Sequence, residues 1–211
     1  MRIRQQIGWI ILLFTLVPVC GAAESTACDP WAAKIASVQG NVEAKRGDTA
    51  DWHAVTLNEI YCPGDQIRVG DKSRAGIILA NETLVRLDEN SAIKLTTIEK
   101  DTFSLVELFR GIAHFISRVP RSLKVNTPFV NAAIEGTEFV VAITDQQTSV
   151  TVFEGTVLTQ NDQGELRITN GESAVAKSDA APGKVLLAKP RDAVQWALYF
   201  PPVVDSKEGQ L

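Results

Sequence analysis

The strongest constraint on the fold is a hydrophobic alternation with a period close to two. Apolar residues take every second position in several short runs, and polar turn residues separate these runs. The alternating positions include Ala75, Ile77, Leu79, Val85, Leu87, Ile93, Leu95, Phe139, Val141, Ile143, Val150 and Val152. A strand with one buried face has this period, whereas an amphipathic helix repeats near 3.6. We therefore predict an all-β chain of many short strands, each about five residues long.

Glycines recur between apolar residues inside the predicted strands. They are Gly40, Gly136 and Gly155, with looser copies around Gly111 and Gly171. Glycine within a strand marks a bulge, a bend or a close backbone approach. Bent strands can turn corners, so we expect an irregular β-solenoid or a coiled β-sandwich; unrelated bulged strands in an ordinary sandwich are the alternative. The polar turn 161–164 predicts a hairpin between residues 156–160 and 166–169.

The N-terminus has the three parts of a secretory signal peptide. Arg2 and Arg4 precede an apolar run at 7–19, and small residues follow it. At about 1.5 Å per residue, a helix over this run is too short to cross a hydrocarbon core of about 30 Å. We expect export, with cleavage near Ala22 or Ala23.

Export to an oxidising compartment determines how the cysteines are interpreted. Cys20 would leave with the signal peptide, or would attach the protein to a membrane if it were lipidated. Cys28 and Cys62 remain as an even pair, and we predict that they form a disulfide; two buried free thiols are the alternative. His53 is the only histidine near them and no Cys-x-x-Cys motif occurs, so no metal site is predicted.

Charge and motifs exclude several functional classes. The 211 residues carry 21 Lys and Arg against 25 Asp and Glu, a formal net charge of −4. A nucleic-acid-binding protein is normally basic, so no nucleic-acid partner is expected. The sequence has no nucleophile elbow, zinc-protease motif, phosphate-binding loop or dinucleotide fingerprint. We predict no catalytic residues and no cofactor, and hence a protein that is not an enzyme.

The C-terminal stretch differs from the rest of the chain. Residues 177–184 are typical of a loop or linker, and Pro190 begins a short apolar helix. This helix is too apolar to lie free in water, so it must pack on the domain or on a neighbour. The predicted organisation is a signal peptide at 1–23, an all-β domain at 24–176, and a linker, helix and polar tail at 177–211.

Several motifs, taken together and in order, resemble the FecR domain family. They lie at residues 64–75, 84–91, 125–128, 134–141 and 152–157. The resemblance covers about residues 35–175 and implies a periplasmic, all-β domain. The family is named for a regulator that carries an iron-citrate signal across the envelope to a sigma factor.

That regulator has a cytoplasmic segment and a transmembrane helix before its β domain, whereas a cleavable signal precedes the domain here. The chain therefore looks more like exported members of the family, some of which continue into tetratricopeptide repeats. The resemblance implies a periplasmic, non-enzymatic sensor, adaptor or scaffold that binds a periplasmic or envelope protein in signalling or assembly. The alternative is a module that binds envelope polysaccharide or peptidoglycan, with Trp52 stacking on a sugar ring.

Partner-binding candidates fall into two groups. Arg74 and Arg86 could form a basic spot for the carboxylates of a partner. The second group comes from the predicted C-terminal helix and comprises Trp196, Leu198, Tyr199 and Phe200. Asp65 and Arg68, three residues apart in a glycine-bounded turn, are expected to form a local ion pair that adds little stability.

Overall fold

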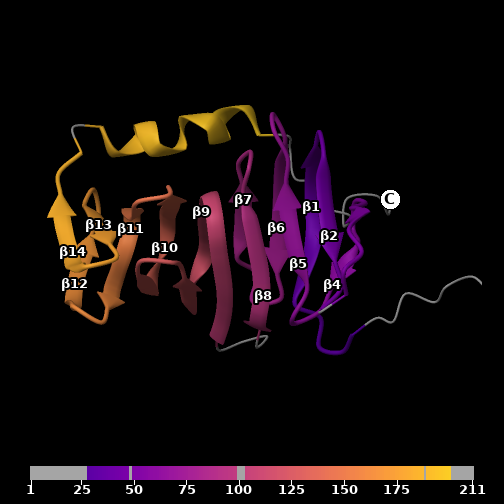
Figure 1. Cartoon of the computed structure of the whole chain (residues 1–211), viewed down its shortest axis with the longest axis horizontal. Helices are drawn as coiled ribbons and strands as arrows, with labels where there is room; N and C mark the ends of the chain where they lie inside the picture. The colour runs from indigo at the N-terminus through magenta and orange to yellow at the C-terminus, as the bar shows by residue number, and fades with distance from the viewer. Residues whose placement is uncertain (1–27, 48, 99–102, 188, 201–211) are drawn as a thin grey trace, which may run out of the picture.

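The computed structural model describes residues 28–47, 49–98, 103–187 and 189–200. Strands dominate these residues, and one short 3₁₀ helix follows them. Figure 1 shows the strands side by side in an elongated array with the helix laid across it. The prediction of an all-β fold with a short C-terminal helix is confirmed. The predicted signal peptide and Cys20 lie outside the described residues.

The first eight strands are short. They are β1 (Ala33–Gln39), β2 (Val42–Lys45), β3 (His53–Ala54), β4 (Ile60–Tyr61), β5 (Gln66–Val69), β6 (Arg74–Leu79), β7 (Leu84–Leu87) and β8 (Ala92–Ile98). The later elements are β9 (Phe103–Asn126), β10 (Asn131–Ile143), β11 (Thr148–Asn161), β12 (Gly164–Thr169), β13 (Ser173–Lys177), β14 (Ala180–Val185) and the 3₁₀ helix η1 (Pro190–Tyr199).

The N-terminal strands close into a barrel. On one side, β1 pairs with β6, β6 with β7, and β7 with the middle of β9. On the other side, the first part of β9 pairs with β8, β8 with β5, and β5 with β2. Because β2 follows β1 directly across Gly40, whose φ of +75° turns the chain, the ring of pairings is complete.

This barrel, with extra strands attached, replaces the expected solenoid or coiled sandwich. Successive coils of a β-solenoid pair in parallel, whereas the strand pairs of the described residues are antiparallel. The physical reason is that the bends at Gly40 and Gly111 let one strand belong to two sheets. The two sides of the barrel are therefore connected through these bent strands, and the strands do not form the stacked coils of a solenoid.

The prediction of strands of about five residues is wrong for the three central ones. β9, β10 and β11 contain 24, 13 and 14 residues. Gly111 and Gly155 have positive φ values of 83° and 97°, so each bends its strand without ending it. At Gly111 a Cβ would collide with Ser91, whose hydroxyl bonds to both backbone groups of Ile112 at 3.0 Å.

The C-terminal strands extend the sheet beyond the barrel, in the order β9, β10, β11, β13, β14. β12 pairs with β11 from Thr169 to Gly164, which confirms the predicted hairpin. The segment 177–184 differs from the predicted loop or linker, because β14 pairs with β13. Pro182 is tolerated there since β14 is an edge strand, where a missing N–H breaks no ladder.

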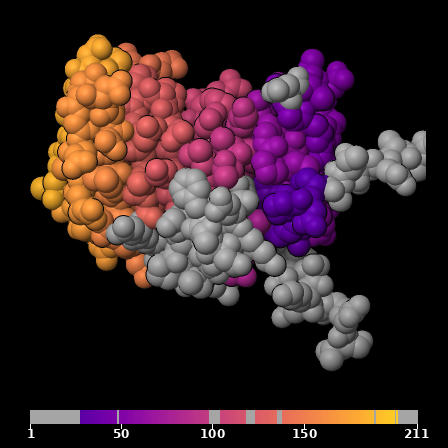
Figure 2. Space-filling view, turned by 90° about the horizontal axis from the view of Figure 1, so that it is seen from below, coloured from indigo at the N-terminus to yellow at the C-terminus, as the bar shows by residue number. Residues whose placement is uncertain are grey.

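A continuous hydrophobic core runs through the barrel into the extension. The alternating apolar residues named from the sequence are buried in it, apart from Ile143, which packs at its margin. Phe115 of β9 stacks on Phe139 of β10, with ring centroids 4.7 Å apart, where barrel and extension meet. In Figure 2 the chain colours run in order from the N-terminal end to the C-terminal end. Within the described ranges, no helix has the length and apolar character needed to cross a membrane.

Candidate functional site

The C-terminal helix with its following residue is here called the strap (residues 190–200), and in Figure 1 it runs transverse to the strands along the top of the array. It packs on the face of the sheet opposite the core, because it contacts Val140, whose neighbours Phe139 and Val141 are core residues. Its first turn has a proline and an i to i−3 hydrogen bond from Asp192 N to Lys189 O of 3.0 Å. Val194 and Ala197 are buried against Val140 of β10. The strap therefore packs on its own domain, one of the two arrangements that its apolar sequence required.

The strap residues proposed as partner contacts point in different directions. Trp196 packs against the sheet beside Ile112 and Phe153, and its ring meets that of Phe200 edge to face at 6.0 Å. Leu198 is 79% exposed and points away from the sheet. The side chain of Tyr199 lies outside the described residues. Of the aromatic candidates whose side chains are described, both serve as contacts between the strap and the sheet.

Phe200 occupies a slot formed by two neighbouring strands. The guanidinium of Arg86 on β7 lies 5.3 Å from the centre of its ring. On β6, a Cβ at Gly76 would come within 3.3 Å of the same ring, so glycine keeps the slot open. The Nε of Arg86 is buried and has no hydrogen-bond partner among the described residues. Burial lowers the pKa of Arg86, and the Glu138 carboxylate partly opposes this effect.

Arg74 lies nearby but already has a partner. Its Nε is 3.2 Å from Oδ1 of Asp88, which follows β7. Together they border a pocket of about 420 Å³ at the edge of the strap. The pocket is lined by Lys72, Ser73, Arg74, Asp88, Glu89 and Trp196. The carboxylates balance the cations, so this pocket differs from the purely basic spot expected from Arg74 and Arg86.

A polar pair that sequence reasoning missed lies beneath the strap. His114 of β9 has a side chain only 4% exposed, and its Nε2 is 3.1 Å from Oε1 of Glu138 on β10. Its ring meets Phe153 at 6.1 Å and Trp196 at 6.5 Å, both edge to face. No hydrogen-bond partner of Nδ1 occurs within the described ranges.

The cross-strand register explains the position of His114 beneath the strap. Arg86 on β7, His114 on β9 and Val140 on β10 are direct neighbours across three strands. Because strand side chains alternate, His114 points away from the core that holds Ala113 and Phe115. The alternation of the sequence could have placed His114 on the outer face, but only the register places it opposite Arg86.

Burial lowers the pKa of His114 to about 4. The negative charge of Glu138 opposes this shift, and the positive charges of Arg86 and Arg191 add to it. The imidazole is therefore neutral at neutral pH, with Nε2–H donating to the Glu138 carboxylate.

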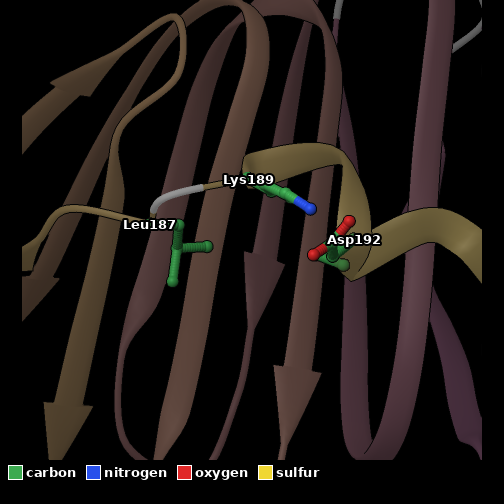
Figure 3. A pocket seen from close by; sticks show the side chains of 4 residues that line it. Leu187, Lys189 and Asp192 are labelled. Atoms are coloured by element: carbon green, nitrogen blue, oxygen red, sulfur yellow. The ribbon is translucent and has the colours of Figure 1, made fainter.

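Where the extension passes into the strap, apolar side chains face solvent. Leu186 is 81% exposed, and the adjacent Val185 and Leu187 are also exposed. Leu187 borders a second pocket, of about 550 Å³. Its other lining residues are Lys189, Asp192 and Ala193. In Figure 3, Leu187 lies apart from the Lys189 and Asp192 side chains, which flank the start of the strap.

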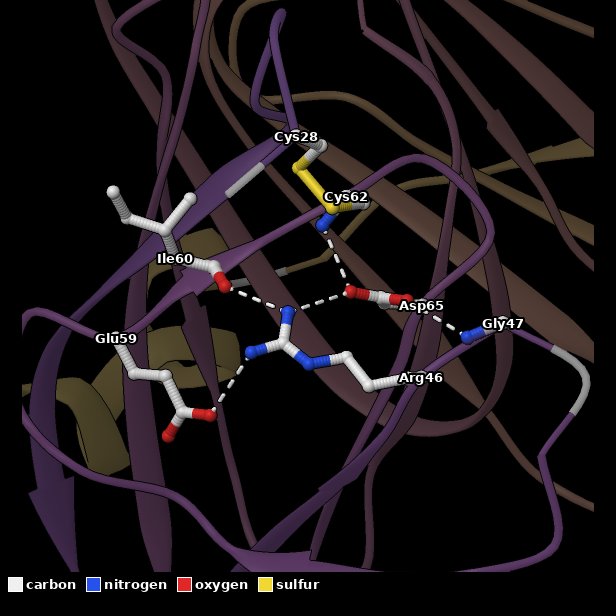
Figure 4. The surroundings of a disulfide bond; sticks show 7 residues. All are labelled: Cys28, Arg46, Gly47, Glu59, Ile60, Cys62 and Asp65. Atoms are coloured by element: carbon white, nitrogen blue, oxygen red, sulfur yellow. Dashed lines mark hydrogen bonds and ion pairs between the residues drawn. A yellow bond between two sulfur atoms is a disulfide. The ribbon is translucent and has the colours of Figure 1, made fainter. Parts of the chain in front are cut away.

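The opposite end of the molecule is held by the predicted disulfide, which is confirmed. Cys28 and Cys62 are bonded, with Cα atoms 5.6 Å apart. The buried carboxylate of Asp65 accepts hydrogen bonds from Gly47 N at 2.7 Å, Cys62 N at 2.8 Å and Arg46 Nη1 at 3.0 Å (Figure 4). This network fixes the turn that carries the second cysteine.

The expected ion pair between Asp65 and Arg68 does not form. Arg68 bonds to Glu43 at 2.8 Å on the neighbouring strand. Residues three apart along a strand point to opposite faces, so these two side chains cannot meet. Arg68 also lies 4.0 Å from the ring centre of Trp52, and Lys45 Nζ lies 5.5 Å from it. The candidate sugar platform is thus already in contact with cations of its own domain.

The geometry defines a class of protein: a disulfide-tied β-barrel with an antiparallel extension and a strap over one face. A family model described as FecR protein matches residues 65–158, from the turn before β5 to within β11. Residues 65–158, which are less than half of the chain, are therefore similar to the FecR family, in agreement with the resemblance of the motifs. The strap lies outside the matched residues.

Solved structures share the fold. Two crystal structures of a candidate anti-sigma factor from Parabacteroides distasonis ATCC 8503 are 20% identical to the chain, each with a TM-score of 0.55. Each match covers 63% of this chain and 63% or 64% of the other. The chain thus spans just under two thirds of the length of those structures. No curated protein matches it significantly.

Metal chemistry has no obvious site here. Among the residues that the structure describes, no three histidine, cysteine, aspartate or glutamate side chains form a group that could hold an ion. Ionisable groups that do gather, such as His114 with Glu138 and Arg46 with Asp65 and Glu59, form ion pairs or hydrogen bonds with one another. Chemically, Val185, Leu186 and Leu187 offer exposed apolar side chains, and the pocket beside the strap offers charged groups of both signs.

Proposed function

We propose that this chain is a non-enzymatic, periplasmic protein-binding module that acts as a sensor, adaptor or scaffold in envelope signalling or assembly. Its FecR-family region and its fold likeness to candidate anti-sigma factors support a signalling role. The signal peptide expected from the sequence supports export, and the Cys28–Cys62 disulfide is typical of an oxidising compartment. Its partner is a periplasmic or envelope protein.

The observation that carries the proposal is the exposed apolar surface at the free end of the extension. β14 is an edge strand with no further strand beside it among the described residues, and its last residue Val185 leads into Leu186 and Leu187. Edge strands recruit extended segments of partners through main-chain hydrogen bonds, and exposed apolar side chains add specificity. Leu198 is a further exposed apolar side chain, on the outer side of the strap, while Trp196 and Phe200 hold the strap in place.

Substitution of Leu186 tests the proposal. Leu186→Asp places a charge in the exposed apolar segment, and we expect it to abolish capture of the partner from an envelope extract. Leu57→Asp is the matched control, because Leu57 is also exposed, at 53%, but lies in the turn between β3 and β4. Eluates are compared by quantitative mass spectrometry.

Two outcomes would overturn it. The first is an eluate that both substitutions leave unchanged. The second is retention on peptidoglycan or envelope polysaccharide that Trp52→Ala abolishes, since that result would assign binding to the opposite end of the molecule.

A further inference from the structure

The strap is separable from the body of the protein. Its buried side chains form a small cluster with Val140 that is distinct from the main core. A ten-residue 3₁₀ helix has poorer backbone hydrogen bonds than an α-helix, and no side chain caps its N-terminus. The order of the strap therefore depends on its contacts with the sheet, and its removal would leave the barrel core intact.

His114 lies at the centre of those contacts. The strap supplies Trp196, whose ring meets the imidazole edge to face, and Arg191, whose guanidinium lies 5.7 Å from the ring of Phe153. The ring of Phe153 meets the same imidazole edge to face at 6.1 Å. His114 is thus enclosed between the sheet and the strap, and the seated strap keeps it from water.

The surroundings of His114 disfavour a second proton. The neutral ring uses Nε2–H for Glu138, so a proton would add to Nδ1, which has no acceptor among the described residues. The charged groups that face the ring are Arg86 from β7, Glu138 from β10 and Arg191 from the strap, while β11 contributes the uncharged Phe153. An imidazolium would add a third cation against one carboxylate in a buried site.

We infer that His114 is an acid-sensitive latch, whose protonation releases residues 190–200 from the sheet and uncovers the face beneath them. Release lets water reach the new Nδ1–H and moves Arg191 away, so the burial that is the largest cause of the lowered pKa is removed and Arg86 is the cation that remains beside the ring. The exposed face would present Phe153 of β11, Val140 of β10 and Arg86 of β7, on the sheet that ends in β14. This inference rests on the proposed function, because the latch would control how much protein surface is exposed to the same partner.

The direction of the pH dependence of strap release follows from how many protons each state binds. With the strap seated, the pKa of His114 is lowered to about 4 from its ordinary 6.5, and solvation of the ring on release returns the pKa toward that ordinary value. Between these values the released state binds more protons, so acid favours release, and the seated strap is fully favoured above the higher value. From about pH 7.5 to about pH 5 the ratio of released to seated strap rises roughly thirtyfold.

Fluorine NMR of 5-fluorotryptophan-labelled protein measures this ratio directly. Trp196 reports on the strap and is assigned with Trp196→Phe, while Trp31 and Trp52 report on the barrel and should not change. His114→Gln keeps an N–H for Glu138 but cannot titrate, so the thirtyfold change should fall below about twofold. His53→Gln is the matched control, because His53 is the other histidine of the chain and its side chain is solvent-exposed.

A wild-type ratio that changes less than about threefold, or an equal change in His114→Gln, would overturn the latch. Saturation-transfer NMR detects the released state even when its population is small. Phe200→Ala removes a contact between the strap and the sheet without changing His114, so it should increase the population of the released state. The same pH series in Phe200→Ala must show the same His114 dependence. Capture of the partner at neutral pH, with no release of the strap in acid, would support the proposed function and refute the latch. Release of the strap in acid, with no capture of a partner, would support the latch and refute the proposed function.

Discussion

The first described residues and the last ones are held in different ways. Around Cys28 and Cys62, a covalent bond, a buried carboxylate and Arg46 tie three chain segments together. The strap at the other end of the chain has no covalent tie and rests on a few side chains packed over a polar pair. Rigidity is therefore concentrated in the barrel, and the element best able to change position lies where the exposed apolar surface also lies.

The largest expected effect on stability concerns the core shared by the barrel and the extension. Phe115→Ala removes a fully buried ring stacked on Phe139 at the barrel–extension junction and should cost about 3–5 kcal/mol of unfolding free energy. Because the core is continuous, urea unfolding should stay a single transition by near-ultraviolet circular dichroism and tryptophan fluorescence. Phe109→Ala, on the same strand but 43% exposed, should change stability by about 0.5 kcal/mol or less. Two separate transitions would show that barrel and extension are independent.

A slightly smaller loss should follow from removal of the covalent tie. Cys28 and Cys62 are 34 positions apart, and in the chain-entropy model the double substitution to serine costs about 3–4 kcal/mol. Thermal unfolding measures the loss, and reduction of the wild-type protein should reproduce it. Thiol titration under denaturing conditions should find both thiols only after reduction. If the double variant also released the strap at neutral pH, the two ends would not be independent.

The smallest effect on global stability is expected in the strap. Trp196→Ala should raise the rate of proteolysis at residues 190–200 many-fold while it shifts the urea midpoint by about 1 kcal/mol or less, because local opening does not require the core to unfold. Leu198→Ala, which removes an exposed side chain, should change neither quantity. A large loss of global stability in Trp196→Ala would show that the strap is part of the cooperative core and is not held separately from it.

Local features of this fold could be predicted from the sequence because local chemistry produces them. The alternation of Ile77, Leu79 and Val85 placed strands and their buried faces, and the turn at 161–164 placed a hairpin. Barrel closure could not be predicted in this way, since it depends on the pairing of β5 with β8 and of β7 with β9. Such pairings join residues distant in sequence, and a glycine bend is compatible with several of them.

The candidate site shows the same limit. Trp196 and Phe200 were identified by their apolar character, yet the sequence did not indicate that they would cover their own sheet. His114 carried no signal beyond its position in a strand, because its meaning comes from Arg86 and Glu138 on neighbouring strands. The expected Asp65–Arg68 pair failed for a reason already present in the chain, the alternation of strand faces.

The length of β9 has a consequence for folding after export. Its first part pairs with β8, its middle pairs with β7, and its second half pairs with β10, so one strand completes the barrel and also starts the extension. If the chain enters the periplasm from its N-terminus, as the proposed export implies, β7 and β8 expose unsatisfied edges until Ile116 has crossed the membrane. A periplasmic chaperone that shields extended segments would be needed most while residues 88–116 cross, and a stall there would be more harmful than one after residue 126.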